Sequence, residues 1–132
     1  MSCDFLRKLW NSWIPLAACG LLLALTAGCS TPVTKTGAVV YSHGSLVANE
    51  SINMDDAWDA CHGALKRLEF EEESGAKDAL EATLVAKSAT DRRITFNLRR
   101  ITDKTTEVRI RVGMFGDERM AREIHEAFRK SF

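Results

Sequence analysis

The chain has 132 residues, of which 45% are hydrophobic and 27% charged, and its 18 basic residues balance its 18 acidic residues. This length suits one domain with one modest core and excludes a multi-domain architecture. The balance hides an asymmetry: Cys29 to Glu81 holds four basic and ten acidic residues, whereas Ala82 to Phe132 holds twelve and seven. Either oppositely charged surfaces of one domain neutralise each other, or the second half offers a basic face to an anionic partner.

The first 27 residues have the order of charged and apolar residues that is typical of an export signal. Arg7 and Lys8 precede an apolar stretch from Trp13 to Ala27. As a helix this stretch spans roughly 22 Å at ~1.5 Å per residue, which falls short of the ~30 Å hydrocarbon core of a membrane. We therefore expect an export signal in place of a membrane span.

The end of the apolar stretch, Leu25-Thr26-Ala27-Gly28-Cys29, resembles a bacterial lipobox, in which small residues precede a cysteine that receives a lipid. The resemblance predicts cleavage between Gly28 and Cys29 and lipidation of Cys29. One departure is Thr26, which stands where leucine is commonest. An ordinary secretory signal cut near Gly28 and a retained anchor helix are the alternatives.

The predicted organisation is a signal peptide at residues 1–28, a polar tether at 29–38 and one periplasmic domain at 39–132. Ser30 follows the cysteine, whereas an aspartate there is the inner-membrane retention signal of enteric-type bacteria. By that resemblance, acylated Cys29 binds membrane lipid in the outer membrane and faces the periplasm. The periplasmic face of the inner membrane is the alternative.

A first strand is predicted at residues 39–48, and a helix follows from the N-cap candidate Asn53 to residue 70. The helix has one apolar stripe, formed by Met54, Trp58, Cys61, Leu65 and Leu68. Cys61 lies in the middle of this stripe, which favours a buried structural thiol over a reactive or bridging one. His62 points about 100° away from Cys61 on a helix, so the pair predicts no metal site. His43 and His125 are isolated in the sequence.

Alternating residues then predict strands at about residues 80–88, 93–99 and 107–114, joined by two short hairpins. Their inward sets are Leu80, Ala82, Leu84 and Ala86; Ile94, Phe96 and Leu98; and Val108, Ile110 and Val112. Residues 70–74, directly after the helix, are an uncertain edge strand before a turn at 75–78. Because inward residues face inward residues, Phe96 is expected opposite both Leu84 and Ile110.

This register places Arg99 between Glu81 and Glu107 on the outer face of the three strands. The same face carries a possible basic face of four arginines, Arg93, Arg99, Arg109 and Arg111, with Lys87 beside them. It is either an ordinary solvated surface with ion pairs or a platform for a phosphorylated or carboxylated surface. A nucleic-acid partner is not indicated, because the face lacks stacking aromatics and the predicted compartment lacks nucleic acid.

The chain closes with a helix from the N-cap candidate Asp117. Its apolar side consists of Met120, Ile124, Ala127 and Phe128. Gly113 and Gly116 mark a structural corner between strand and helix, or a binding corner at the helix N-terminus. The predicted fold class is α+β, with two helices packed on one face of an antiparallel sheet of four to five strands, in the order β-α-β-β-β-β-α.

Three stretches resemble a known family: the signal with its cysteine, AWDACHGALKRLEF after a strand, and TTEVRIRVGMFGDERMAREI. The family consists of short bacterial lipoproteins classed only as a domain of unknown function, with a C-terminal motif of the VRVGxFGDE type. The resemblance implies a lipoprotein with an α+β domain. It implies no activity and no catalytic residues.

The sequence contains no GxSxG motif, no phosphate loop and no HExxH motif. We therefore predict a non-catalytic, membrane-anchored module that binds an unidentified envelope protein, glycan or lipid surface, without a cofactor or a metal. One alternative is a small envelope hydrolase or transferase that uses carboxylates from residues 69–73. Others are a redox or metal carrier that uses Cys61, and an accessory to outer-membrane assembly, which rests on similar architecture alone.

Overall fold

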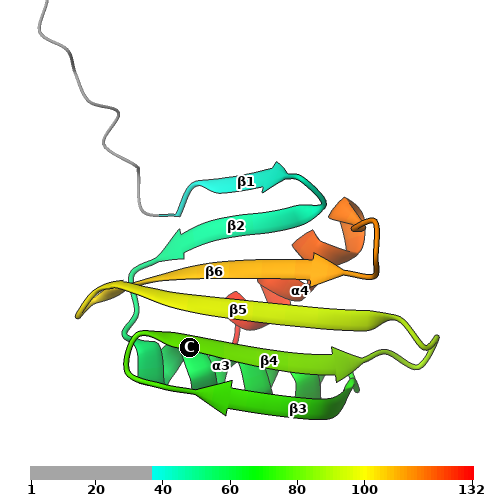
Figure 1. Ribbon diagram of the computed structural model, residues 1–132, viewed down its shortest axis with the longest axis horizontal. Helices are drawn as coiled ribbons and strands as arrows, with labels where there is room; N and C mark the ends of the chain where they lie inside the picture. Colours follow the sequence, from blue (N-terminus) through cyan, green and yellow to red (C-terminus); the bar gives the residue numbers. More distant parts are fainter. Residues whose placement is uncertain (1–36) are drawn as a thin grey trace, which may run out of the picture. The chain divides into compact units, whose positions relative to one another are not determined.

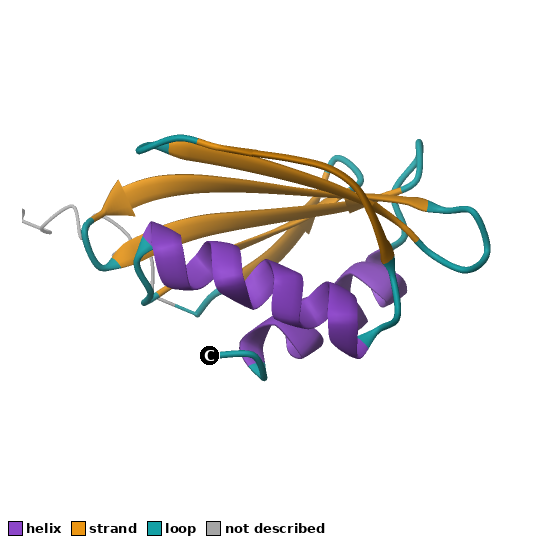
Figure 2. Ribbon diagram, turned by 90° about the horizontal axis from the view of Figure 1, so that it is seen from below, coloured by secondary structure: helices purple, strands orange, loops and turns teal. Residues whose placement is uncertain are grey.

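The structure, a computed structural model, describes residues 37–132. The predicted signal peptide, the cleavage and lipidation positions Gly28 and Cys29, and residues 29–36 of the predicted tether lie outside the described residues. The described chain forms one layer of strands and one layer of helices (Figures 1 and 2). Neither helix in this range has the length and apolar content that a membrane crossing requires.

The described strands form one six-stranded antiparallel sheet. The strands are β1 (Val39–Ser42), β2 (Ser45–Glu50), β3 (Glu71–Lys77), β4 (Glu81–Lys87), β5 (Arg93–Thr102) and β6 (Thr105–Val112). Their order across the sheet is β1-β2-β6-β5-β4-β3 (Figure 1). Strands β3 to β6 therefore form a meander, and the β1–β2 hairpin extends the sheet beside β6.

The two helices, α3 (Met54–Arg67) and α4 (Glu118–Arg129), lie on the same side of the sheet. Figure 2 shows both helices below the strands and no described helix above the sheet. This arrangement confirms the predicted α+β class. The predicted number of strands is too low, because the described range contains six.

The additional strand comes from residues 39–48, which the sequence pattern predicts as one strand. His43 and Gly44 have φ angles of 51° and 75° and connect β1 to β2 by a tight turn. Positive φ at both central residues matches the twist of an antiparallel hairpin, and glycine adopts it without strain. The chain therefore folds back on itself, with Val39 opposite Ala48. The glycine that weakens the strand pattern is part of the turn.

Strand β3 shows that the uncertain segment after α3 is an edge strand. It continues through Gly75 to Lys77, so the turn predicted at 75–78 is placed too early. A Cβ atom at Gly75 would lie 3.1 Å from the Trp58 ring. The missing side chain therefore lets β3 pass closely over the half-buried indole, and this contact keeps the strand extended at Gly75.

The predicted register of the meander is confirmed. Phe96 lies opposite Leu84 in β4 and opposite Ile110 in β6. Leu80 is an exception, because its side chain is 63% exposed and it precedes β4. The Asp78 side chain accepts hydrogen bonds from the backbone N–H groups of Leu80 and Glu81, both at 2.8 Å. This local turn takes Leu80 out of the strand alternation, and its predicted inward position is wrong.

Both predicted N-caps are confirmed. The Asn53 side-chain oxygen accepts a hydrogen bond from the Asp56 backbone N–H at 2.8 Å, and Asp117 accepts one from Met120 at 3.0 Å. These contacts satisfy backbone donors that have no partner within the first turn of each helix. Helices α3 and α4 therefore begin one residue after the caps.

The core lies between the helix layer and the inner face of the sheet. Its largest fully buried side chains include Phe96, Phe128 and Ile110. Cys61 is also fully buried, which confirms the predicted structural thiol. Burial raises the pKa of Cys61 well above its usual range, because the interior disfavours the thiolate.

Candidate functional site

No described helix covers the face of the sheet opposite α3 and α4, which we call the open face (Figure 2). The strand register places the four predicted arginines on this face: Arg93 and Arg99 from β5, and Arg109 and Arg111 from β6. All four are exposed. The fold thus brings together the residues of the predicted basic face.

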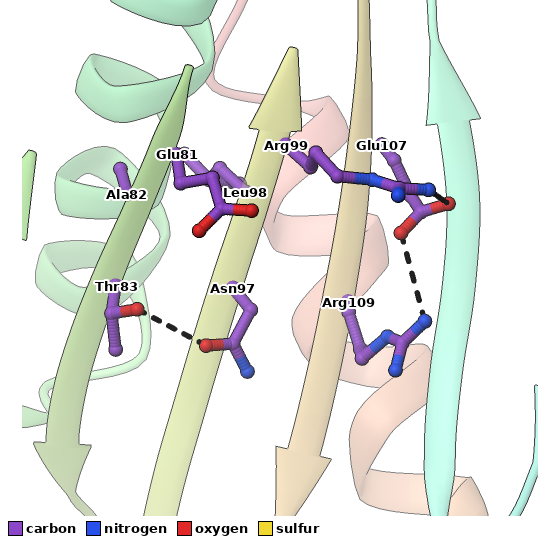
Figure 3. Close-up of a pocket in the computed structure, with 8 residues that line it drawn as sticks. All are labelled: Glu81, Ala82, Thr83, Asn97, Leu98, Arg99, Glu107 and Arg109. Carbon is purple, nitrogen blue, oxygen red and sulfur yellow. Dashed lines mark hydrogen bonds and ion pairs between the residues drawn. The ribbon is translucent and has the colours of Figure 1, made fainter. Parts of the chain in front are cut away.

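Two of these arginines share one carboxylate. Arg99 Nη2 lies 3.1 Å from Glu107 Oε2, and Arg109 Nη2 lies 3.6 Å from Glu107 Oε1. In Figure 3 the Arg99 side chain extends across β6 toward Glu107. The Glu107 side chain is only 17% exposed, whereas both arginine side chains are more than half exposed. Glu107 therefore holds two cations in defined positions at the surface.

The predicted ladder of Glu81, Arg99 and Glu107 forms only in part. All three residues are aligned across β4, β5 and β6. Within residues 37–132, however, Glu81 has no cationic partner within 4 Å. The Arg99 guanidinium turns toward Glu107. Unlike Glu81, Glu107 also contacts Arg109, and its side chain is only 17% exposed.

A shallow cavity of about 340 Å³ lies between these charged groups (Figure 3). Its lining consists of Glu81, Ala82, Thr83, Asn97, Leu98, Arg99, Glu107 and Arg109. The Thr83 hydroxyl donates to Asn97 Oδ1 at 3.1 Å. This bond orients the Asn97 amide so that its NH₂ group remains available, because no hydrogen bond within the described residues uses it. The cavity therefore presents both donors and acceptors.

The other end of the open face carries Arg93, Arg111 and Lys87. Lys87 Nζ lies 2.6 Å from Asp91 Oδ1, and the hydrogen bond to Asp91 raises the pKa of Lys87 above its usual value. The Arg111 guanidinium donates to the Met114 carbonyl oxygen at 2.6 Å. Arg93 has no carboxylate within 4 Å in the described part of the chain. Glu71 and Glu73 of β3 also act on Lys87, so the cations at this end without a carboxylate within 4 Å in the described range are Arg93 and Arg111.

A buried contact between a histidine and a glutamate lies on the opposite side of the sheet, and sequence reasoning missed it. His125 Nε2 of α4 and Glu50 Oε1 of β2 are 2.7 Å apart, and both side chains are 6% exposed. Arg129 Nε reaches within 3.9 Å of the other Glu50 oxygen. A signal was present, since Glu50 continues the inward alternation of Leu46 and Ala48. An acidic residue at an inward position needs a buried partner.

Two contacts that involve histidine lie at the surface, outside the lining of the sheet-face cavity. Ser42 Oγ and His43 Nδ1 are 2.7 Å apart in the β1–β2 turn. His62 Nδ1 is 3.1 Å from Glu72, and its ring packs edge-on against Trp58. In the described range, no three His, Cys, Asp or Glu side chains are placed to hold a metal ion together.

Comparison with known proteins links the chain to one protein family. A family model described as "Protein of unknown function (DUF3568)" matches residues 12–131. The match covers all of the described residues except the last, and most of the sequence before them. No curated protein matches the chain.

Proposed function

The chain belongs to the DUF3568 family of proteins of unknown function, and we propose that it is a lipid-anchored, non-catalytic periplasmic module that binds an anionic surface of the cell envelope through its open sheet face. The observation that carries this proposal is the convergence of Arg93, Arg99, Arg109 and Arg111 on the one face of the sheet that no described helix covers. The lipid anchor and the binding face are tested by separate experiments.

The anchor rests on the sequence around Cys29. Small residues precede the cysteine, and the apolar stretch before it is shorter as a helix than the ~30 Å hydrocarbon core of a membrane. A lipoprotein cysteine normally carries three acyl chains, and each buried methylene contributes ~0.8 kcal/mol, so the attachment is effectively permanent. Ser30 after the cysteine favours the periplasmic side of the outer membrane. Thr26 stands where leucine is commonest in a lipobox, so the labelling test includes a variant at this residue.

The chemistry of the open face fits carboxylate or phosphate groups. A guanidinium presents a planar fork of donors that matches both groups. Glu107 restrains Arg99 and Arg109 before a ligand arrives, which lowers the entropy lost on binding. Arg93 adds a cation without a described carboxylate partner. A face with restrained and free arginines suits recognition of a defined anionic surface.

The shape of the face favours a large partner over a small substrate. Small-molecule sites usually enclose most of the ligand in a concave, largely apolar pocket. The cavity between Glu81 and Arg109 is open and lined mainly by polar side chains. A flat surface of this kind is better suited to contact an envelope protein, a glycan or lipid headgroups. We therefore propose binding in preference to catalysis.

The anchor is tested by metabolic labelling with radioactive palmitate. The wild-type chain should incorporate the label, and Cys29→Ser should not. Thr26→Leu, which restores the commoner residue of the lipobox, should be labelled at least as completely as the wild type. Label that persists in Cys29→Ser would contradict lipidation at this position.

The binding face is tested by photocrosslinking in intact envelopes. A photoreactive amino acid at Asn97, in the sheet-face cavity, should give a discrete adduct, whereas one at the exposed Glu123 of α4 should not. Combining Arg99→Ala with Arg109→Ala should abolish the Asn97 adduct. Sensitivity of the adduct to protease, glycan hydrolase or organic extraction identifies a protein, glycan or lipid partner. The proposed face would be refuted if both positions gave the same adduct yield, or if the Asn97 adduct persisted when both arginines were replaced.

A further inference from the structure

The loop between β6 and α4 presents two consecutive apolar side chains to solvent. Met114 is 78% exposed and Phe115 is 89% exposed, the largest exposed fractions among the large apolar side chains of the described domain. We call this pair the 114–115 tip. Single exposed apolar residues are common on protein surfaces, but an adjacent pair on a constrained loop calls for an explanation.

The backbone on both sides of the tip is held in place. Gly113 and Gly116 have φ angles of 67° and 85°, which favour glycine. Between them, the Met114 carbonyl oxygen accepts the 2.6 Å hydrogen bond from Arg111. The Gly113 N–H donates to the Arg93 carbonyl oxygen at 2.7 Å. The exposure of the tip is thus a property of a defined turn.

The β1–β2 hairpin braces the same loop from the side. A Cβ atom at Gly44 would lie 2.8 Å from the Phe115 carbonyl oxygen. A Cβ atom at Gly116 would collide with the Gly44 backbone and the Tyr41 hydroxyl. Two glycines without side chains therefore let the hairpin turn and the loop touch. The backbone of the loop is thus held against the hairpin while the Phe115 side chain is exposed.

Three arginines lie near the tip along the chain or on the neighbouring strand. Arg111 and Arg93 lie beside it on the sheet, and Arg119 is in the first turn of α4. The nearby carboxylates of Asp117 and Glu118 are already paired, with Arg92 at 2.6 Å and with Arg122 at 2.7 Å. Within residues 37–132, Arg93 and Arg119 have no carboxylate within 4 Å. The surface around the tip therefore combines apolar side chains with excess positive charge.

We propose that the 114–115 tip inserts into the interface of the membrane that holds the acylated Cys29, with Arg93, Arg111 and Arg119 against anionic headgroups. This inference rests on the lipid anchor of the proposed function and adds a second point of membrane contact. Apolar side chains flanked by arginines match the chemistry of an anionic bilayer surface, which offers an apolar interior beneath negative charge. The contact gives the domain a preferred orientation on the membrane.

The small size of the tip favours a membrane over a protein partner. A stable protein–protein interface buries about 1,600 Å² in total, far more than two side chains provide. A membrane that already holds the chain by its lipid is present at high effective concentration, so a weak second contact suffices. The charge around the tip also complements anionic lipid without requiring a specific protein shape.

The lengths of the segments permit both contacts at once. Residues 29 to 37 span at most roughly 28 Å when extended at ~3.5 Å per residue. Gly37 and His43, at the two ends of β1, are six residue steps apart, a distance of about 20 Å at ~3.3 Å per residue. Because the turn at His43 and Gly44 touches the loop, a tether of this length allows Cys29 and the tip to reach the same bilayer.

The test is the immersion depth of a nitroxide label on the acylated protein, reconstituted into phosphatidylglycerol vesicles. Phe115→Cys carries the label at the tip, and Leu80→Cys carries it at another exposed apolar position, at the opposite end of the sheet. Cys61 is fully buried and Cys29 is acylated, so neither should take the label. We expect the label at residue 115 to be several-fold more accessible to oxygen and less accessible to an aqueous nickel reagent than the label at residue 80. Equal accessibility at both positions would overturn the inference.

Two further measurements separate the possible failures. In phosphatidylcholine vesicles, the label at residue 115 should be less immersed than in phosphatidylglycerol, because the headgroup layer has no net negative charge. A photoreactive amino acid at residue 115 should form lipid adducts in intact envelopes, and a discrete protein adduct would overturn membrane insertion. Palmitate incorporation is read independently: a palmitate-labelled protein without tip immersion refutes only this inference, and an unlabelled protein refutes the proposed anchor.

Discussion

The two faces of the sheet consist of alternate residues from the same strands, yet they are determined differently. On the inner face, Phe96, Ile110 and their neighbours are buried against the helices. On the outer face, Asn97 and Arg109 are exposed, and the positions of the charged groups depend on which cross-strand partner each one chooses. Burial therefore follows from local alternation, whereas the chemistry of the open face follows from contacts between strands.

Substitutions at two adjacent residues of β5 test the difference between the inner and outer faces of the sheet. Phe96→Ala should lower the free energy of unfolding by about 3–5 kcal/mol, because it removes a fully buried ring and leaves a cavity. Asn97→Ala, which changes the exposed neighbour, should stay within about 0.5 kcal/mol of the wild type. Urea denaturation of both variants measures the difference. Similar losses for both would show that the open face is buried in solution.

The buried pair of Glu50 and His125 should show the next largest effect. Glu50→Gln replaces a buried carboxylate and should lower the free energy of unfolding by ~1–3 kcal/mol, since His125 loses a charged partner at 2.7 Å. A double-mutant cycle with His125→Gln measures the coupling, which we expect at ~0.5–3 kcal/mol. Additive single effects would show that the pair contributes no mutual stabilisation.

The helix caps should have intermediate effects. Asn53→Ala removes the 2.8 Å hydrogen bond to the Asp56 N–H and should cost about 1 kcal/mol in thermal or chemical unfolding. Asn53→Ser keeps a capping oxygen and should retain most of the stability. If both variants lose stability equally, Asn53 acts through packing and not through its cap.

The open face should respond least to loss of a single charge. Arg99→Ala should lower stability by only ~0.2–1 kcal/mol, because the ion pair with Glu107 is more than half exposed on the arginine side. Glu107→Ala should have a larger effect than Glu81→Ala, since only Glu107 has arginine partners in the described structure. The opposite order in urea denaturation would indicate that Arg99 turns toward Glu81 in solution.

Asp117 links the α4 cap to pH. The Met120 backbone N–H, and then Arg92, hold the pKa of Asp117 below its usual value. A carboxylate with a lowered folded-state pKa stabilises the fold above its unfolded pKa of about 3.9, and this contribution is lost as the pH falls through the lower folded value. Asp117→Asn keeps a capping oxygen without titrating. Its stability should therefore fall less steeply than that of the wild type in acid denaturation below about pH 4.

The sequence predicts which residues form the candidate site but not which of them contact one another. The alternation of β5 and β6 places all four arginines on one face, and pairing of inward residues aligns Arg99 with Glu81 and Glu107. The sequence does not say which carboxylate Arg99 selects, because both are one strand away. That choice depends on the second cation, Arg109, and on the lower exposure of Glu107.

By itself, the sequence determines the features that depend on residues a few positions apart. These features are the two helices with their caps, the inward residues of the meander other than Leu80, and the burial of Cys61. Helix stripes, strand alternation and capping bonds are all local, so they can be read before any tertiary contact is known.

The tertiary structure alone decides the contacts between distant segments. These are the β1–β2 hairpin beside β6, the pairing of Glu50 with His125, and the close approach of Gly44 to the loop of the 114–115 tip. Each of them joins residues far apart in the chain, and its energy depends on how closely whole elements pack. Local sequence patterns do not say which distant elements pack together, which is why these contacts appear only when the sheet and helices are assembled.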